Sequence, residues 1–245
     1  MNIVEPAVQL LAHTAIVPDA IEQRLEIQEG STDAETLTVY AGRSCYESWS
    51  RPNEKTREDK DYLRRTLFEQ GHFSILEHAT ATFYITGVSR ALLAEITRHR
   101  HLSFSVRSQR FVDESDANIV IPPAIRDSVS DRAQNIEADY GDLTERAFLA
   151  YKLTSSELEQ QLNLPRKQAR EAARALLPNM VETRIVVTGN LRAWHEVIQR
   201  RTAPDADAEM QEVMELAREQ LELVSPVIFG KNVPEKEEKQ LNSAA

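Results

Sequence analysis

Short β-branched segments alternate with longer segments of helical character along this 245-residue sequence. Val, Ile and Thr favour strands, and apolar residues three or four positions apart favour helices. These patterns predict strands at 7–17, 79–86, 118–121 and 182–188. They predict helices at 33–49, 56–70, 91–101, 127–161 (one helix or two), 166–177, 191–201 and 205–223. The order of elements indicates a fold of the α/β or α+β class.

No segment rich in Gly, Pro or Ser is long enough to separate two domains, although a chain of this length could form one large domain or two small ones. We therefore expect a single domain over residues 1–245. Its ordered core is expected at about 7–230. A polar tail is expected from 231 to 245.

Helix-capping residues and glycines set the limits of several elements. Thr32, Ser89 and Asn190 have side-chain oxygens suited to the N-cap, where they accept a hydrogen bond from a free backbone N–H. Gly71 is expected to end the second helix, because glycine is typical of the position after a helix. Gly87 is expected to end the second strand.

The composition argues against several classes of protein. Lys and Arg number 29 and Asp and Glu number 39, so the formal net charge of −10 argues against a general nucleic-acid binder. No apolar run approaches the roughly 18 residues of a membrane span. The first residues include an acid and no basic region, unlike a secretory signal. Cys45 is the one cysteine, which excludes an internal disulfide and fits a reducing cytoplasm.

Arginine is concentrated in three short segments of this acidic chain. They contain Arg90, Arg98, Arg100, Arg107 and Arg110 in the first, Arg166, Arg170 and Arg174 in the second, and Arg192, Arg200 and Arg201 in the third. Like charges this close repel one another unless an anion neutralises them, and guanidinium groups match phosphate and carboxylate. The segments therefore predict sites for anionic ligands. A solvated basic face is an equally good interpretation of the second segment, whose apolar side is expected to bury Ala169, Ala172, Ala173 and Leu176.

Histidine and cysteine give weaker signals. His99 and His101 form an H-x-H pair, but no Asp, Glu or Cys set accompanies it at metal-ligand spacing, so no metal is expected. His72 and His78 are more readily interpreted as structural histidines. Cys45 is expected to be a small buried residue rather than a nucleophile. No GxGxxG, Walker or GxSxG motif is present.

The first basic segment resembles a known signature. Arg98-His99-Arg100, Ser103, Ser108 and Arg110 match the RHRxxSxxxxSxR pattern of the flavin-dependent thymidylate synthases. Further segments resemble that family in the same order along the chain; they are 42–49, 72–90, 166–179 and 182–194. The resemblance extends from about residue 7 to about residue 230. It implies a central twisted, mainly antiparallel sheet flanked by helices.

The resemblance also implies an activity. Enzymes of this family convert dUMP to dTMP, take the carbon from 5,10-methylenetetrahydrofolate and release tetrahydrofolate. NADPH is the reductant and FAD the cofactor that carries the hydride. The family forms homotetramers with active sites at subunit interfaces, and no nucleic acid or membrane is expected as a partner.

The resemblance assigns site residues position by position. Nucleotide binding is implied for Glu95, Arg98, Ser108, Gln109, Arg110, Arg174 and Arg201. FAD binding is implied for Ser74, Arg98, His99, Arg100, Val106, Asn190, Arg192, His195 and Glu196. Arg201 corresponds to the catalytic arginine that polarises the uracil, where fixed positive charge stabilises developing negative charge. No protein nucleophile is then required.

Three positions depart from the family or have an open role. Glu196 stands where many relatives have a histidine, so that either the adjacent His195 replaces that histidine or the flavin contact is lost. Val106 replaces a polar residue, which leaves only a backbone contact. Tyr46 is expected beside the folate or nucleotide pocket.

Two other functions remain as alternatives. A nucleotide- or RNA-binding module would use the arginines without catalysis, and its affinity would fall steeply with salt. It explains the charge but not the order of the family segments. A metal-dependent hydrolase would use the histidines but lacks a ligand set at suitable spacing.

Overall fold

The computed structural model describes residues 2–231, and all of the predicted polar tail except Lys231 lies outside these residues. The described residues pack into two compact units. The first comprises 2–9, 83–187 and 200–216, and the second comprises 10–82, 188–199 and 217–231. Three strands and two helices have residues in both units. The single domain expected from the sequence over residues 1–245 stays a prediction.

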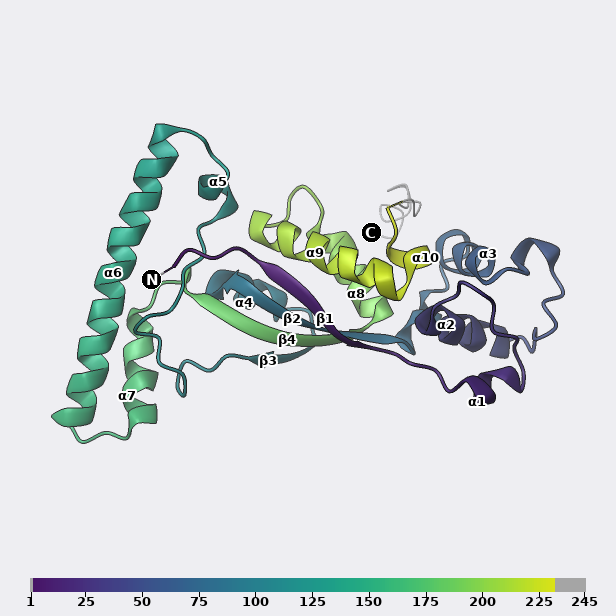
Figure 1. Cartoon of the computed structure of the whole chain (residues 1–245), viewed down its shortest axis with the longest axis horizontal. Coiled ribbons are helices and arrows are strands. Elements are labelled where there is room, and N and C mark those ends of the chain that lie inside the picture. The colour runs from purple at the N-terminus through teal and green to yellow at the C-terminus, as the bar shows by residue number, and fades with distance from the viewer. Residues whose placement is uncertain (1, 232–245) are drawn as a thin grey trace, which may run out of the picture. The chain divides into compact units, whose positions relative to one another are not determined.

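A four-stranded antiparallel sheet forms the centre of the fold (Figure 1). In order across the sheet its strands are β1 (Ala7–His13), β2 (Thr80–Ser89), β4 (Glu182–Asn190) and β3 (Ser103–Val106). Buried and partly exposed side chains alternate along much of β2 and β4, as expected where one face of a sheet packs on a core. Phe83, Ile85, Ile185 and Val187 are completely buried. The prediction of helices around a mainly antiparallel sheet is confirmed.

The limits of the first two strands differ from the prediction. β1 ends at His13 rather than residue 17, because the chain turns into a helix that begins at Pro18. β2 continues through Gly87 to Ser89. Gly87 has a φ of +66°, and a Cβ atom there would lie 1.8 Å from the carbonyl oxygen of Glu5. Glycine is required at this position for close backbone approach within the strand and does not end the strand.

The other two strand differences concern pairing. Residues 118–121 do not form a strand: Ile119 makes isolated bridges with Ile3 and Val181, and the two prolines that follow have no N–H to continue a ladder. β3, by contrast, forms where no strand was predicted. Its sequence, Ser-Phe-Ser-Val, alternates serine with two strand-forming residues but is only four residues long, and pairing with β4 completes the strand.

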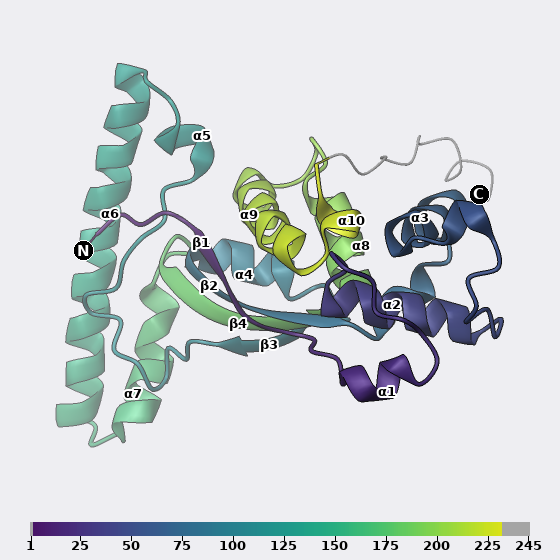
Figure 2. The same ribbon diagram turned by 45° about the vertical axis from the view of Figure 1, so that its right-hand side comes forward.

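The first unit carries a long helix with a shorter helix beside it. Its helices are α4 (Arg90–Ile96), α5 (Pro123–Arg126), α6 (Asp131–Gln160) and α7 (Arg166–Ala173). α6 is one 30-residue helix rather than two, and α7 lies along it in both views (Figure 1 and Figure 2). Neither α6 nor any other helix within residues 2–231 is both long and apolar enough to cross a membrane.

α7 buries less of its surface than predicted. Ala169 and Ala173 are completely buried, whereas Ala172 is exposed and Leu176 is 45% exposed. The 3₁₀ turn (Arg174–Leu176) that follows α7 rotates Leu176 away from the buried face, whereas Ala172 precedes the turn and lies beside the narrow buried stripe formed by Ala169 and Ala173.

The second unit consists mainly of short helices. They are α1 (Pro18–Glu22), α2 (Asp33–Ser44), α3 (Asp59–Arg64) and α10 (Pro226–Phe229), while α8 (Leu191–Arg201) and α9 (Ala208–Val224) have residues in both units. α2 ends before the predicted limit at residue 49, because Glu47 and Arg51 have positive φ angles of 49° and 51°. The helix predicted at 56–70 is divided into a 3₁₀ turn (Glu54–Thr56), α3 and a π-helical turn (Arg65–Glu69).

The three predicted N-caps are confirmed. The side-chain oxygen of Thr32 accepts from the Glu35 N–H at 3.2 Å, and that of Ser89 accepts from the Leu92 N–H at 3.0 Å. Oδ1 of Asn190 accepts from the backbone N–H three residues later at 2.8 Å. A cap of this type contributes about 1 kcal/mol to helix stability.

Candidate active site

The residues predicted to bind the nucleotide all belong to the first unit. They are Glu95, Arg98, Ser108, Gln109, Arg110, Arg174 and Arg201. Glu95 is on α4, Arg174 directly follows α7, and Arg201 is the last residue of α8. Ser108, Gln109 and Arg110 lie in the loop that leaves β3. The fold therefore gathers residues far apart in the sequence into one compact unit.

Arg201 is held along one edge of its guanidinium group. Its Nε donates to Nε2 of His99 at 2.9 Å, and its Nη2 lies 3.3 Å from Oε2 of Glu95. Glu95 also pairs with Arg98 at 3.2 Å. Only 16% of the Arg201 side chain is exposed. Its Nη1 makes no hydrogen bond or ion pair with any residue in the range 2–231, so this nitrogen can donate to a ligand.

The contact with Arg201 determines the protonation state of His99. An arginine Nε always donates, so Nε2 of His99 must accept, and the neutral ring then carries its proton on Nδ1. Burial lowers the pKa of His99, and the positive charges of Arg201, Arg200 and Arg98 lower it further, against an opposing effect of Glu95. The ring is therefore a neutral acceptor near neutral pH.

A cavity of about 520 Å³ brings two arginines together in the first unit. Arg90, Gln109, Glu171 and Arg174 are among its lining residues. Neither Arg90 nor Arg174 forms an ion pair or side-chain hydrogen bond within the described part of the chain, and Glu171 lies 3.6 Å from Arg110. Burial lowers the pKa of Arg90; the nearby charge of Glu114 raises it and that of Arg174 lowers it. Arginine nevertheless remains protonated, so the cavity suits an anion.

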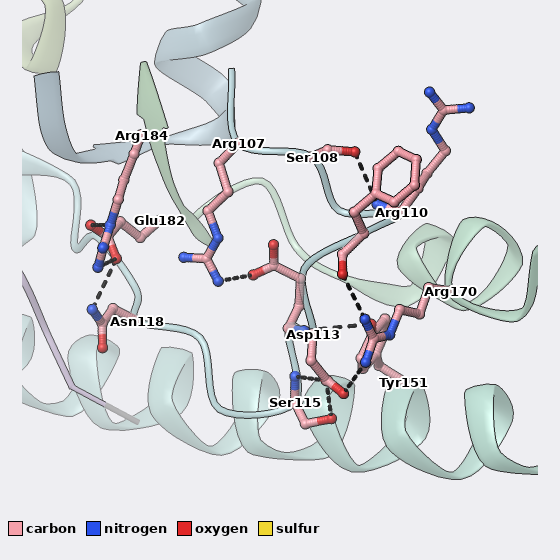
Figure 3. A network of polar contacts seen from close by, with 12 residues as sticks. Arg107, Ser108, Arg110, Asp113, Ser115, Asn118, Tyr151, Arg170, Glu182 and Arg184 are labelled. Atoms are coloured by element: carbon pink, nitrogen blue, oxygen red, sulfur yellow. Dashed lines mark hydrogen bonds and ion pairs between the residues drawn. The ribbon is translucent and has the colours of Figure 1, made fainter. Parts of the chain in front are cut away.

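The loop that carries Ser108, Gln109 and Arg110 is tied to α7 by Arg170 (Figure 3). Nη1 of Arg170 donates to the carbonyl oxygen of Phe111 at 2.7 Å, and Nη2 donates to Oδ2 of Asp113 at 2.8 Å. Because Arg174 is one helical turn after Arg170, the same turn both holds this loop and contributes to the cavity.

The same loop is tied to the sheet edge and to α6. Arg107 directly follows β3, and its side chain pairs with that of Glu114 at 3.2 Å (Figure 3). The backbone N–H of Glu114 donates to the hydroxyl of Tyr151 on α6 at 3.4 Å. Burial raises the pKa of Glu114, against the opposing effect of the Arg107 and Arg90 charges. Contacts on both sides of Ser108, Gln109 and Arg110 therefore limit the movement of these residues.

A second cavity, of about 450 Å³, lies within the second unit. Ser74, Arg192, His195 and Glu196 are among its lining residues. Arg192 pairs with Glu196 at 3.0 Å and also with Glu77. The hydrogen bonds that Arg192 donates to Glu196 and Glu77 raise the pKa of Arg192. Two carboxylates thus offset the positive charge of this arginine.

His195 and Glu196 occupy different surroundings on α8. His195 is only 7% exposed, and its ring stacks on Phe73 with centroids 5.0 Å apart. Glu196 is exposed and faces Arg192 one turn earlier. His195 thus lies in an aromatic contact with Phe73, whereas Glu196 acts on the charge of Arg192.

The predicted FAD residues divide between the two units. Those in the second unit are Ser74, Asn190, Arg192, His195 and Glu196, and those in the first are Arg98, His99, Arg100 and Val106. Asn190 uses Oδ1 to cap α8, and Val106 ends β3 with its side chain half-buried. Arg98 and Arg100 are exposed in the turn before β3. Each subset is thus placed within its own unit.

The remaining candidate residues are exposed. The expectation that Cys45 is buried is wrong: it is exposed, because α2 ends one residue before it. Tyr46 is 72% exposed. His72, His78 and His101 are also exposed. Within residues 2–231, no group of three or more His, Cys, Asp or Glu side chains is arranged to hold a metal ion.

Two contributing residues had no role assigned from the sequence. In the sequence Arg90 has no distinguishing feature beyond its place in a basic segment, yet it directly follows the Ser89 cap and lines the 520 Å³ cavity. Glu77 has no distinguishing feature in the sequence. Its position five residues after His72 carries no signal of a contact with Arg192, 115 residues away in the sequence.

Comparison with known proteins identifies the family. The family model described as thymidylate synthase complementing protein matches residues 27–227. The flavin-dependent thymidylate synthase of Mycobacteroides abscessus is 45% identical over 240 residues, which cover 94% of this chain and 90% of that protein. The protein of the same name from Mycobacterium tuberculosis is 45% identical over 213 residues, which cover 82% of this chain and 81% of that protein.

The fold also has a counterpart among solved structures. It resembles thymidylate synthase X from Helicobacter pylori, whose crystal structure contains FAD and dUMP, with a TM-score of 0.59. The match covers 91% of this chain and 99% of that chain at 18% sequence identity, so it shows a common fold. This chain belongs to the thymidylate synthase complementing protein family, and the family predicted from the arginine-rich signature is confirmed.

Proposed function

We propose that this protein is a flavin-dependent thymidylate synthase that converts dUMP to dTMP. The carbon donor is 5,10-methylenetetrahydrofolate, which leaves as tetrahydrofolate, and NADPH is the reductant. Family membership supports this function. The structural observation that carries it is the cavity in which Arg90 and Arg174 lie together with no carboxylate paired to either within the described residues. A phosphate monoester carries enough negative charge to neutralise both.

We assign the binding of dUMP to the first unit. Arg90 and Arg174 would bind the phosphate, and Gln109 in the same cavity would supply an amide hydrogen bond. Ser108 and Arg110 belong to the same loop, which Arg170 and Glu114 hold in place. An anchored loop requires less ordering when the nucleotide binds, which favours affinity.

Arg201 would act on the uracil ring. Negative charge develops on the ring oxygens as the base becomes activated, and a fixed guanidinium stabilises that charge where it forms. The Nε and Nη2 atoms are already engaged by His99 and Glu95, which leaves Nη1 to donate. No nucleophilic side chain is required, in agreement with the distance in sequence between Cys45 and the signature.

The residues present fit FAD. Three of the predicted FAD residues are arginines accessible to a ligand: Arg98 and Arg192 have side chains 69% and 40% exposed, and Arg100 is exposed. They match a group that carries a pyrophosphate. In the second unit Ser74 and Asn190 would contribute to this binding, while His195 packs beside the cavity and Glu196 sets the charge of Arg192. In the first unit His99 and the Val106 backbone would contribute. When bound, FAD supplies hydride transfer between NADPH and the one-carbon unit.

We also propose a homotetramer in the cytoplasm, with active sites at subunit interfaces. Exposed leucines on α6 support an assembly: Leu143, Leu149 and Leu153 are 59%, 58% and 54% exposed. The free thiol of Cys45 is compatible with a reducing compartment. Size-exclusion chromatography with light scattering would measure the number of subunits.

The visible absorption spectrum tests the proposed function. The purified protein should show a flavin spectrum that is bleached by NADPH faster in the presence of dUMP. Addition of 5,10-methylenetetrahydrofolate should then give dTMP, measured by chromatography. A protein that stays colourless after incubation with FAD would contradict the proposal. RNA binding that weakens steeply with salt would instead support the binding-module alternative.

A further inference from the structure

Two acceptors of different charge hold one edge of Arg201. Nε donates to the uncharged imidazole of His99 at 2.9 Å, whereas Nη2 lies 3.3 Å from the Glu95 carboxylate. Glu95 also pairs with Arg98 at 3.2 Å, so its charge is divided between two arginines. Arg201 therefore has a fixed orientation but keeps much of its positive charge.

We infer that His99 is a positioning residue for Arg201: its neutral imidazole, with the proton on Nδ1, orients the guanidinium without reducing its charge. This role rests on the proposed function, in which Arg201 stabilises charge on the uracil, and it is separate from the FAD contact predicted for His99. A carboxylate in place of His99 would orient Arg201 equally well. It would also offset the charge that the reaction needs, as Glu77 and Glu196 do at Arg192.

Four charged groups act on His99. Arg98 and Glu95 come from α4 and the turn after it, and Arg200 and Arg201 come from the end of α8. Three of these four groups are cations. A proton on His99 would remove the acceptor used by Arg201 and add a positive charge beside the other three.

The rate of dTMP formation should therefore decrease at acidic pH, where His99 takes up a proton. Burial, together with the surrounding cations, holds the pKa of His99 below the ordinary histidine value of about 6.5. The unfolded chain binds this proton at a higher pH than the folded protein does. Stability consequently decreases as the pH falls below about 6.5, in the same direction as activity.

Three variants separate positioning from packing. His99→Gln keeps an oxygen that can accept from Nε of Arg201 but cannot be protonated. His99→Leu keeps similar volume and removes the acceptor. His101→Gln is the matched control, because His101 is an exposed histidine two residues further along the same segment. The pH dependence of kcat for dTMP formation is measured from about pH 5 to about pH 9, per mole of bound FAD, which absorbance determines.

The expected results differ between the variants. The acid midpoint is the pH at which kcat falls to half of its plateau on the acid side. His101→Gln should have the same acid midpoint as the unmodified protein. His99→Gln should retain kcat at pH 8 within about fivefold and lose that midpoint, whereas His99→Leu should lower kcat about 10²-fold with the KM for dUMP changed less than about threefold. A His99→Gln variant with the unmodified acid midpoint, or a His99→Leu variant with unchanged kcat, would overturn the inference.

Histidine titration by NMR tests the same pair without an activity assay. The resonance of His99 is identified by its absence in His99→Gln. Arg201→Ala should raise the pKa of His99, because a neighbouring cation is removed, and an unchanged titration would overturn the inference. If the unmodified protein forms no dTMP, the proposed function fails, while this titration still decides whether a neutral His99 holds Arg201.

Discussion

Arg192 and Arg201 lie near opposite ends of α8, and their surroundings differ in both charge and exposure. Arg192 pairs with two carboxylates and its side chain is 40% exposed. Arg201 has a neutral imidazole and one shared carboxylate as partners and is 16% exposed. Arg201 is thus a fixed and only partly compensated cation, whereas Arg192 is a compensated cation at the surface.

The difference indicates how each arginine can be used. A buried guanidinium with a fixed orientation stabilises charge that develops during a reaction, because no reorganisation is needed when the charge forms. A surface guanidinium held by carboxylates can bind an anionic ligand only by exchanging those partners, at a cost of the order of a surface ion pair. We therefore expect large effects on rate at Arg201 and small effects on affinity at Arg192.

The largest effect is expected from Arg201→Ala. Loss of a fixed donor at the developing charge should reduce kcat for dTMP formation about 10²–10³-fold, with the flavin spectrum retained. Arg200→Ala is the control, since Arg200 is an exposed arginine on the same helical turn. Normal turnover by Arg201→Ala would remove the proposed distinction between the two ends of α8.

Arg174→Ala should act on the KM for dUMP rather than on kcat. A charge-assisted hydrogen bond contributes about 1.5–3 kcal/mol, so we expect an increase in KM of about tenfold to a hundredfold in steady-state assays. Arg166→Ala, at the start of the helix that Arg174 directly follows, is the matched control, because its side chain is 72% exposed. An unchanged KM in Arg174→Ala would support the interpretation of this segment as a solvated basic face.

His195→Ala should affect stability more than FAD binding. Removal of a buried ring that stacks on Phe73 should lower the free energy of unfolding by about 1–2 kcal/mol, measured by urea denaturation of the apoprotein. FAD affinity, measured by fluorescence titration, should change little. Weakened FAD binding with unchanged stability would instead show that His195 replaces the histidine found in relatives.

The smallest effect is expected from Glu196→Gln. This change keeps the size of the side chain but removes one of the two negative charges beside Arg192, so FAD affinity should increase about two- to fivefold in a fluorescence titration. Glu219→Gln, an exposed change on α9, is the control. A decrease in affinity would mean that Glu196 itself contacts FAD.

Local features of the sequence determined which segments form helices and which form strands, and where many of these elements begin or end. The caps at Thr32, Ser89 and Asn190 occur where their side-chain chemistry predicts, because capping depends on residues only two or three positions apart. The strand ends and strand pairings that depend on distant partners cannot be predicted from neighbouring residues. Gly87 lies inside β2 because the backbone of Glu5 approaches it, and β3 forms because β4 lies beside it.

The sequence by itself determined the family and the chemical types of the site residues, since the signature at 98–110 consists of residues suited to anions. Only the tertiary structure decided which of those residues keep their charge. Arg201 and Arg192 are the same amino acid on one helix, yet His99 orients the first and Glu77 and Glu196 neutralise the second. The net charge available at a side chain depends on neighbours that folding brings from distant positions, and so the role of an arginine follows from its partners.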